Sequence, residues 1–257
     1  MTDLVALNSQ THRALRVAVT RARSEHANVN VVPVIPREFP RLLAQYPIFF
    51  TKSAESGRFE PAALLGFAGG ENLFLSEGSW DAAYVPLQIQ RQPFALIPRR
   101  GDAAVAAQPS LDLALDLSSP HVQTQEGERL FKDDGQPTLF LQDISSIMQA
   151  LVAGSNEAYA FTGRLAELSL LEPVQIDIEF VDRSETKFQG LYWIAAAALK
   201  ALPAPQLAEL RDREYLEWMY FQMASLAHVA GLVARKNRRI SGVTPVNPGG
   251  AGDAAQR

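Results

Sequence analysis

Hydrophobic and polar residues alternate along several short segments of the chain, and a period of two is typical of β-strands. The clearest case is residues 111–117, where a leucine stands at every second position between Asp or Ala. Residues 174–180 alternate in the same way and residues 187–194 follow after a turn, so the two segments predict a β-hairpin. Shorter apolar runs predict further strands at residues 13–20, 29–35, 48–51, 63–67, 73–76 and 94–97.

Proline and glycine refine this pattern in the first half of the chain. Pro33 interrupts one apolar run and has no N–H to donate to a neighbouring strand, so that strand is expected at the edge of a sheet. Gly69 and Gly70 can adopt positive φ, and they lie between residues 63–67 and 73–76. We therefore expect these two strands to form a β-hairpin.

Short helices are expected between the strands. Pro36 begins one that ends before Pro47, because the residue before a proline avoids the helical region. Ser79 is a suitable N-cap for a second helix. Pro86 fits the first turn of a third, which is expected to run through Arg91.

The second half of the chain shows the period of an α-helix. Apolar residues recur at helical spacing in residues 140–151 and again in residues 158–168, and Gly154 between them allows either a helical hairpin or one bent helix. Residues 206–236 carry one continuous apolar stripe and predict a last helical region. Residues 241–257 are rich in Gly, Pro and Ala and are expected to be disordered.

Strands thus dominate the first half and helices the second, and one β-hairpin stands among the helices. Because strands and helices do not alternate, the sequence predicts an α+β fold: a mostly antiparallel β-sheet in the N-terminal half, a helical C-terminal half and one inserted β-hairpin. The length of 257 residues and the hydrophobic fraction of 47% are those of an ordinary globular protein. We expect one domain over residues 1–240.

The chain contains no cysteine, which excludes disulfides, thiolate metal sites and a cysteine nucleophile. Its first residues carry an acid at Asp3 and no basic segment before an apolar run, so a secretory signal is not expected. No stretch reaches the roughly 18 consecutive apolar residues that a transmembrane helix needs. These features predict a cytoplasmic location and no membrane span.

A formal net charge of −4 argues against a nucleic-acid partner, because affinity for phosphate backbones comes mostly from Lys and Arg. One basic cluster at the end of the last helical region is an exception. Such cations favour the negative end of a helix dipole, although a basic cluster can also contact phosphate or a membrane surface. The cluster comprises Arg235, Lys236, Arg238 and Arg239.

Catalytic and metal-binding motifs are absent from the sequence. The chain has no HExxH metal site, no GxSxG nucleophile turn and no phosphate-binding GxxxxGK sequence. Two carboxylate sets remain: Asp177 with Glu179 on one face of a strand, and an acidic loop at residues 126–134. Both are more typical of solvated surfaces than of acid–base or cation sites. We therefore expect no metal and no cofactor.

Trp80, Tyr84 and Arg91 lie close together in the sequence. These residue types dominate binding hot spots, because they bury a large area and keep a polar group available. The alternative is a core tryptophan with a hydrogen-bonded tyrosine, which is common in globular proteins. The set therefore points either to a binding surface or to a packed core.

Several motifs around these residues resemble the SapC family of bacterial proteins. The resemblance is carried by YPIFF, ALLGF, ENLFLSEGSW and YVPLQIQRQPF within residues 46–94, and by EGERLF at residues 126–131. Members of the family are named after a surface-layer locus and often carry a permease label, which the lack of a spanning segment argues against. They tend to be encoded near TonB-dependent receptors, tryptophan-halogenase-like proteins and cupin-like oxygenases. The resemblance therefore implies an accessory role in nutrient uptake or in modification of a ligand or receptor.

We expect an accessory binding protein rather than an enzyme, with an unidentified protein or small molecule as its partner. A homo-oligomer is compatible with the sequence. Two alternatives stay open: an enzyme that acts on a small molecule through carboxylates and arginine, and a structural surface-layer protein. The candidate ligand-binding residues are the polar and aromatic members of the motifs, namely Trp80, Tyr84, Arg91, Glu126 and Arg129.

Overall fold

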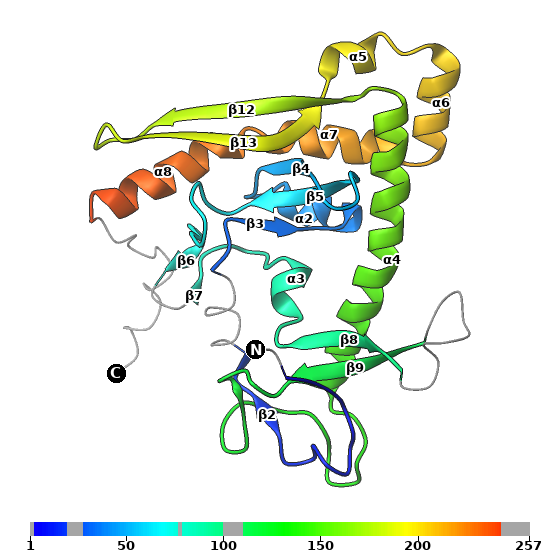
Figure 1. Cartoon of the computed structure of the whole chain (residues 1–257), viewed down its shortest axis with the longest axis vertical. Coiled ribbons are helices and arrows are strands. Elements are labelled where there is room, and N and C mark those ends of the chain that lie inside the picture. The colour runs from blue at the N-terminus through cyan, green and yellow to red at the C-terminus, as the bar shows by residue number, and fades with distance from the viewer. Residues whose placement is uncertain (1–2, 20–27, 77–78, 100–109, 243–257) are drawn as a thin grey trace, which may run out of the picture.

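The computed structural model describes residues 3–19, 28–76, 79–99 and 110–242 (Figure 1). Its largest sheet has five antiparallel strands in the order β12-β13-β4-β5-β3, so strands from both halves of the chain lie side by side. These strands are β3 (Val31–Pro33), β4 (Ile48–Lys52), β5 (Phe59–Leu64), β12 (Leu171–Glu179) and β13 (Glu185–Ile194).

Smaller sheets complete the β structure of the described residues. Two have three antiparallel strands each, in the orders β1-β9-β8 and β10-β2-β11, and another pairs β6 with β7. Figure 1 shows β2, β8 and β9 below the large sheet. The strands are β1 (Leu4–Ala6), β2 (Arg16–Val17), β6 (Leu75–Ser76), β7 (Ser79–Trp80), β8 (Phe94–Pro98), β9 (Leu111–Asp116), β10 (Val122–Gln123) and β11 (Glu128–Arg129).

One long helix, α4 (Leu139–Glu167), runs from the small sheets to the large one (Figure 1). Thr138 caps its N-terminus, because the side-chain oxygen accepts a hydrogen bond from the Leu141 N–H at 3.3 Å. The remaining helical segments are the 3₁₀ helix η1 (Pro36–Glu38), α2 (Phe39–Leu42), α3 (Leu87–Gln90), α5 (Ala196–Lys200), α6 (Ala204–Asp212), α7 (Tyr215–Ser225) and α8 (His228–Ile240).

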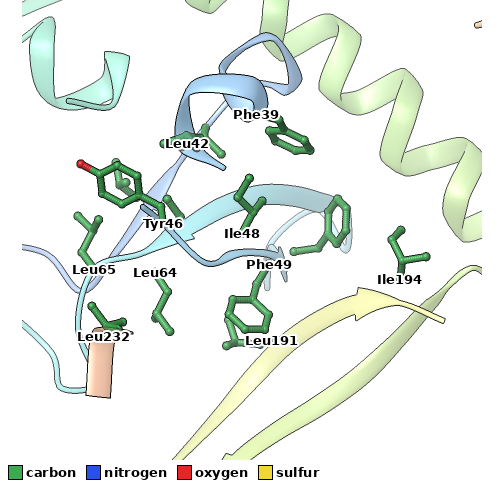
Figure 2. Packing of buried hydrophobic residues seen from close by; sticks show 14 of the residues in the cluster. Phe39, Leu42, Tyr46, Ile48, Phe49, Leu64, Leu65, Leu191, Ile194 and Leu232 are labelled. Carbon is green, nitrogen blue, oxygen red and sulfur yellow. The ribbon is translucent and has the colours of Figure 1, made fainter. Parts of the chain in front are cut away.

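Helix α4 contributes to both hydrophobic clusters of the described residues. Phe161 and Leu165 belong to the larger cluster, which includes the large sheet, and Ile144 and Met148 belong to the smaller one. Burying side chains of this size stabilises the fold by about 1.5–3 kcal/mol each. Figure 2 shows how residues near β4 pack against other elements in the larger cluster: Phe39, Leu42, Tyr46, Ile48, Phe49, Leu191 and Leu232.

Helix α7 docks on the large sheet through a buried polar network. Strands β13 and β4 pair at two positions, and the network lies just beyond them. The Gln222 side chain accepts from the Ile194 N–H at 3.2 Å and donates to the Ile48 carbonyl at 2.9 Å. The Ser225 hydroxyl accepts from the Ile48 N–H at 2.9 Å. Both side chains are fully buried. Their hydrogen bonds satisfy backbone N–H and C=O groups that β13 and β4 do not pair with each other.

Both edges of the large sheet carry features that hinder further strand pairing. At one edge, β3 is three residues long and contains Pro33, as the sequence predicts. At the other edge, β12 contains Pro173 and a register shift between Val174 and Ile176. A proline removes a donor and a bulge breaks the ladder, so neither edge is a regular template for an added strand.

The predicted α+β class is confirmed, and every described strand pair is antiparallel. The predicted hairpin at residues 174–194 is present as β12 and β13, and it extends the large sheet because β13 pairs with β4. Residues 140–168, for which two arrangements were open, lie almost entirely in one helix. No helix in the described ranges is long and apolar enough to cross a membrane. Residues 243–257, most of the predicted disordered tail, lie outside the described residues.

The predicted hairpin around Gly69 and Gly70 is wrong. Strand β5 pairs with β4 and β3, and β6 pairs with β7 instead. The chain leaves the sheet after Leu64, and a side chain closes the loop, because the Glu71 carboxylate accepts the Phe67 N–H at 2.9 Å. A backbone hydrogen bond from the Leu73 N–H to the Leu65 carbonyl at 2.8 Å brings the chain back beside the end of β5, but the two segments do not continue as paired strands.

Several predicted boundaries also differ. Within residues 13–20, of which residues up to 19 are described, the strand is confined to Arg16–Val17. Ser79 begins β7 instead of capping a helix, because it pairs back onto β6. The last helical region is divided into α6, α7 and α8, since the chain turns at Glu214 and again at residues 226–227.

Gly154, in the middle of α4, marks a close approach between elements. A Cβ at this position would lie 2.5 Å from Ile35 Cδ1 and 2.8 Å from Ile35 Cβ, closer than packed carbon atoms approach. Gly163 lies in the same helix, and a Cβ there would meet nothing within 4 Å. Both glycines lie in the same helix, but Gly154 closely approaches Ile35 and Gly163 has open space beside it.

We predict opposite effects for Gly154→Ala and Gly163→Ala. Alanine gains about 1 kcal/mol over glycine in a helix interior, so Gly163→Ala should raise the free energy of unfolding. In Gly154→Ala the clash with Ile35 should outweigh this gain and lower that free energy by about 1–3 kcal/mol. Urea denaturation measures both variants, and stabilisation by both would contradict the close approach.

Candidate functional site

Three of the motifs meet at the hydroxyl of Tyr46, which lies in the core. The indole N–H of Trp80 donates to this hydroxyl at 2.7 Å, and the hydroxyl donates to the carbonyl of Tyr84. The ring of Tyr46 packs on Phe74, with the ring centroids 4.4 Å apart. Tyr46 is fully buried and Trp80 is half-buried. This part of the chain therefore forms an internal junction.

The buried carboxylate of Glu38 organises the adjacent segment. Glu38 is 2% exposed and accepts hydrogen bonds from the Ile35 N–H at 3.0 Å, the Leu87 N–H at 2.8 Å and the Tyr84 hydroxyl at 2.9 Å. Burial raises the pKa of Glu38, and the three donors and Arg41 oppose that increase. Burial and the neighbouring carboxylate also raise the pKa of Tyr84. The carboxylate thereby ties η1 to Tyr84 and to the start of α3.

Helix α8 forms ion pairs with residues that flank the β6–β7 pair. Lys236 pairs with Glu71, and Arg235 pairs with Asp81. The guanidinium of Arg235 also lies 4.5 Å from the ring centroid of Phe74, a cation–π contact. The side chain of Arg235 is only 18% exposed, so solvent screens these interactions weakly.

A third cation of the same cluster binds backbone atoms. Arg239 donates to the carbonyls of Asn72 and Leu75, at 3.0 Å and 2.8 Å. Three of the four cations in the basic cluster thus bind residues 71–75 and Asp81 of the same chain.

Arg91 makes its hydrogen bonds close to its own position. Its Nε donates to Gln88 Oε1 at 2.7 Å, and another guanidinium N–H donates to the carbonyl of Phe94 at 2.7 Å. Burial lowers the pKa of Arg91. Among the described residues, no hydrogen bond joins Arg91 to Trp80 or Tyr84. The structure therefore brings Trp80 and Tyr84 to one junction and leaves Arg91 outside it.

Glu126 and Arg129 lie at the small sheet formed by β2, β10 and β11. Arg129 forms an ion pair with Asp133, and its hydrogen bond and charge lower the pKa of Asp133. Gly127 has a φ of +98°, and a Cβ there would lie 2.4 Å from the carbonyl oxygen of Val17. Only glycine fits this approach to β2, so the second motif has a packing explanation.

The binding role of these five candidates stays a prediction. Four of them already have hydrogen-bond partners inside the protein, and Glu126 is exposed. The enzyme alternative requires Arg91 to share a pocket with the acidic loop, and no described hydrogen bond or ion pair joins them. Within the described ranges, no three His, Asp or Glu side chains are close enough to hold a metal ion.

A hollow of about 740 Å³ opens between η1, α4 and the start of α7. One side is aromatic, where the ring centroids of Tyr215 and Trp218 lie 5.4 Å apart. Both rings pack edge-on against the buried Phe161, so the core holds them in place. Tyr215 is buried and Trp218 is half-buried. The charged lining residues are Arg37, Glu157, Arg213 and Glu214.

Ion pairs fix most of the charged groups at the rim. Arg37 forms two hydrogen bonds to Glu157, one of them from Nε at 2.8 Å, and this carboxylate raises the pKa of Arg37. Arg213 forms an ion pair with Glu209 at 3.2 Å, and its guanidinium lies 5.9 Å from the ring centroid of Tyr215. The hollow thus combines aromatic surface with oriented guanidinium groups.

The sequence does not predict the hollow, because the apolar residues within 206–236 predict one continuous stripe along a helix and no cavity beside it. One signal is present in the sequence: Tyr215 and Trp218 stand at helical spacing directly after the charged residues 211–214. This composition is typical of binding hot spots. Arg37 and Glu157 are distant in sequence, and only the fold brings them to the same place.

Glu38 makes stability depend on pH. Its pKa in the folded state is raised above the ordinary value of 4.5, so between the two values the folded state binds more protons than the unfolded state. Stability therefore falls as the pH rises through that window. We predict that the free energy of unfolding of wild type minus that of Glu38→Gln decreases above about pH 4.5 and levels off above the folded pKa. Denaturation at successive pH values measures the difference, and an increase with pH would contradict the burial of this carboxylate.

The contacts of Arg235 should contribute measurably to stability. We predict that Arg235→Ala lowers the free energy of unfolding by about 1–2 kcal/mol, because it removes a half-buried ion pair and a cation–π contact. Arg211→Ala is the control, since Arg211 and its partner Asp212 are 70% and 66% exposed. That variant should change stability by less than about 0.5 kcal/mol. If Arg235→Ala and Arg211→Ala change the free energy of unfolding equally in thermal denaturation, the contacts of Arg235 do not stabilise the packing of α8.

Comparison with known proteins gives one match. No curated protein and no solved structure matches the chain. The family model described as SapC matches residues 7–232, which is most of the chain and includes both sets of motifs and the hollow. The chain belongs to the SapC family.

Proposed function

We propose that this SapC-family protein is a non-catalytic binding protein that holds its ligand in the hollow beside Trp218. The observation that carries the proposal is a hollow of about 740 Å³ whose walls combine tyrosine, tryptophan and two arginines. Ligand sites in proteins measure roughly 300–1,000 Å³. Tyr, Trp and Arg are also the residue types that contribute most to binding energy.

The walls of the hollow are held in place before a ligand arrives. Tyr215 and Trp218 pack on Phe161, and Glu157 holds Arg37 with two hydrogen bonds. Immobilising a flexible side chain on binding costs about 0.5–1.5 kcal/mol. Because these side chains are already oriented, less of the binding energy is lost to their ordering.

The wider role that we propose is accessory: capture of a ligand in support of nutrient uptake or of ligand modification. The resemblance to proteins encoded near TonB-dependent receptors supports this part. The lining contains no hydroxyl or thiol beside a histidine, which favours binding over nucleophilic catalysis.

Ligand capture should be visible at the indole of Trp218. We predict that a fraction of a bacterial small-molecule extract shifts the Trp218 indole N–H resonance of ¹⁵N-labelled protein, because the ring lines the hollow. Trp193 is the internal control, since its indole N–H donates to Glu172 on the β-hairpin at 2.8 Å. Trp218→Phe assigns the resonance and keeps an aromatic ring at that position.

Two results would contradict the proposal. Shifts confined to the Trp80 or Trp193 resonance would place the binding site outside the hollow. A shift of Trp80 would favour binding at the junction around Tyr46. A screen in which no fraction moves Trp218 would remove the support for a ligand at this site.

A further inference from the structure

Three of the four charged side chains in the hollow already have partners. Arg37 and Glu157 pair with each other, and Arg213 pairs with Glu209. The carboxylate of Glu214 makes no hydrogen bond or ion pair with other described residues, and the cation whose charge reaches it is Arg37. Glu214 is therefore the charged group in the lining that remains available to a ligand.

The lining carries two arginines and two glutamates, and Glu214 is the one of these four whose charge no ion pair among the described residues takes up. A cation that enters is attracted by the Glu214 carboxylate and by the π face of the half-buried Trp218 ring. The Tyr215 ring is buried and already has the guanidinium of Arg213 over it, so Trp218 is the ring that a ligand can reach.

The backbone at Glu214 agrees with a functional position. Its φ of +63° lies in the left-handed region, where glycine or asparagine costs least. The residue follows the C-cap of α6, a place that glycine usually occupies. A glutamate here places its carboxylate at the hollow despite the backbone strain, and such strain is concentrated at binding sites.

We propose that the ligand carries a primary ammonium or guanidinium group, which binds between the Glu214 carboxylate and the ring of Trp218. The inference rests on the proposed function and adds the chemical class of the ligand. The cationic group belongs either to a small free amine or to a lysine or arginine side chain in a peptide. Both sources present the same chemistry to the hollow.

A purely structural role for Glu214 predicts something else. A carboxylate near the N-terminus of α7 stabilises the helix dipole, and removal of its charge would then affect the fold and not ligand binding. Glu217 lies in the first turn of the same helix, is exposed and does not line the hollow. Glu217→Gln is therefore the matched control for Glu214→Gln, because each removes one charge from the same helix end.

The test uses three probes on the full chain. N-acetyl-lysine methylamide carries the cation on a peptide-like stem, N-acetyl-norleucine methylamide is its neutral counterpart, and cadaverine is a free amine. The Trp218 indole resonance follows each titration. We expect the lysine derivative or cadaverine to bind about tenfold more tightly than the norleucine derivative. Glu214→Gln should weaken cation binding about tenfold, while Glu217→Gln should leave it within about twofold.

The outcomes separate the two proposals. Binding of the lysine derivative without cadaverine supports a peptide side chain, and binding of cadaverine alone supports a free amine. Equal binding of the lysine and norleucine derivatives would contradict a cationic ligand, while the hollow would remain the binding site. Shifts by the cell extract without any shift by the cationic probes would do the same. Loss of cation binding in both glutamate variants would reject a specific role for Glu214, and no shift of Trp218 by any probe or extract would overturn both proposals.

Discussion

The arrangement of this fold depends on the buried carboxylate of Glu38. A carboxylate removed from water is costly unless hydrogen bonds replace its hydration. Here the donors come from the backbone of Ile35, the backbone of Leu87 and the hydroxyl of Tyr84. These hydrogen bonds hold η1 against residues 84–87, which are distant from it in the sequence. Arg37, the preceding residue, is exposed and reaches α4 at the rim of the hollow.

The family motifs and the proposed binding site occupy different parts of the protein. Three of the four motifs in residues 46–94 meet at Tyr46, and cations of α8 pair with Glu71 and Asp81 beside them. Their polar atoms are used inside the fold, so they offer little to a ligand. The hollow is built instead from η1, α4 and α7, and the Glu214 carboxylate there makes no hydrogen bond or ion pair with the rest of the described chain. This division separates a rigid scaffold from the surface that we propose for binding.

Patterns that local forces determine could be predicted from the sequence. The alternation at residues 111–117 and the helical period at residues 140–168 both correspond to observed elements. The hairpin of β12 and β13 could be predicted because a short turn joins its strands. Pairing between distant strands, such as β13 with β4, could not, and the Glu71 side chain closes a loop where a hairpin was expected. The hollow escaped prediction for the same reason, since Arg37 and Trp218 meet only in the fold. Composition alone does not distinguish a tryptophan that is hydrogen-bonded inside the protein from one whose ring lines a hollow.

The hollow at the start of α7 is the site that we propose for binding, and a cation is the ligand that we propose for it. A crystal structure of the protein with bound N-acetyl-lysine methylamide tests it most directly. We expect density for the ammonium group between the carboxylate of Glu214 and the ring of Trp218. Density at the junction around Trp80, or elsewhere on the surface with nothing beside Trp218, would contradict it.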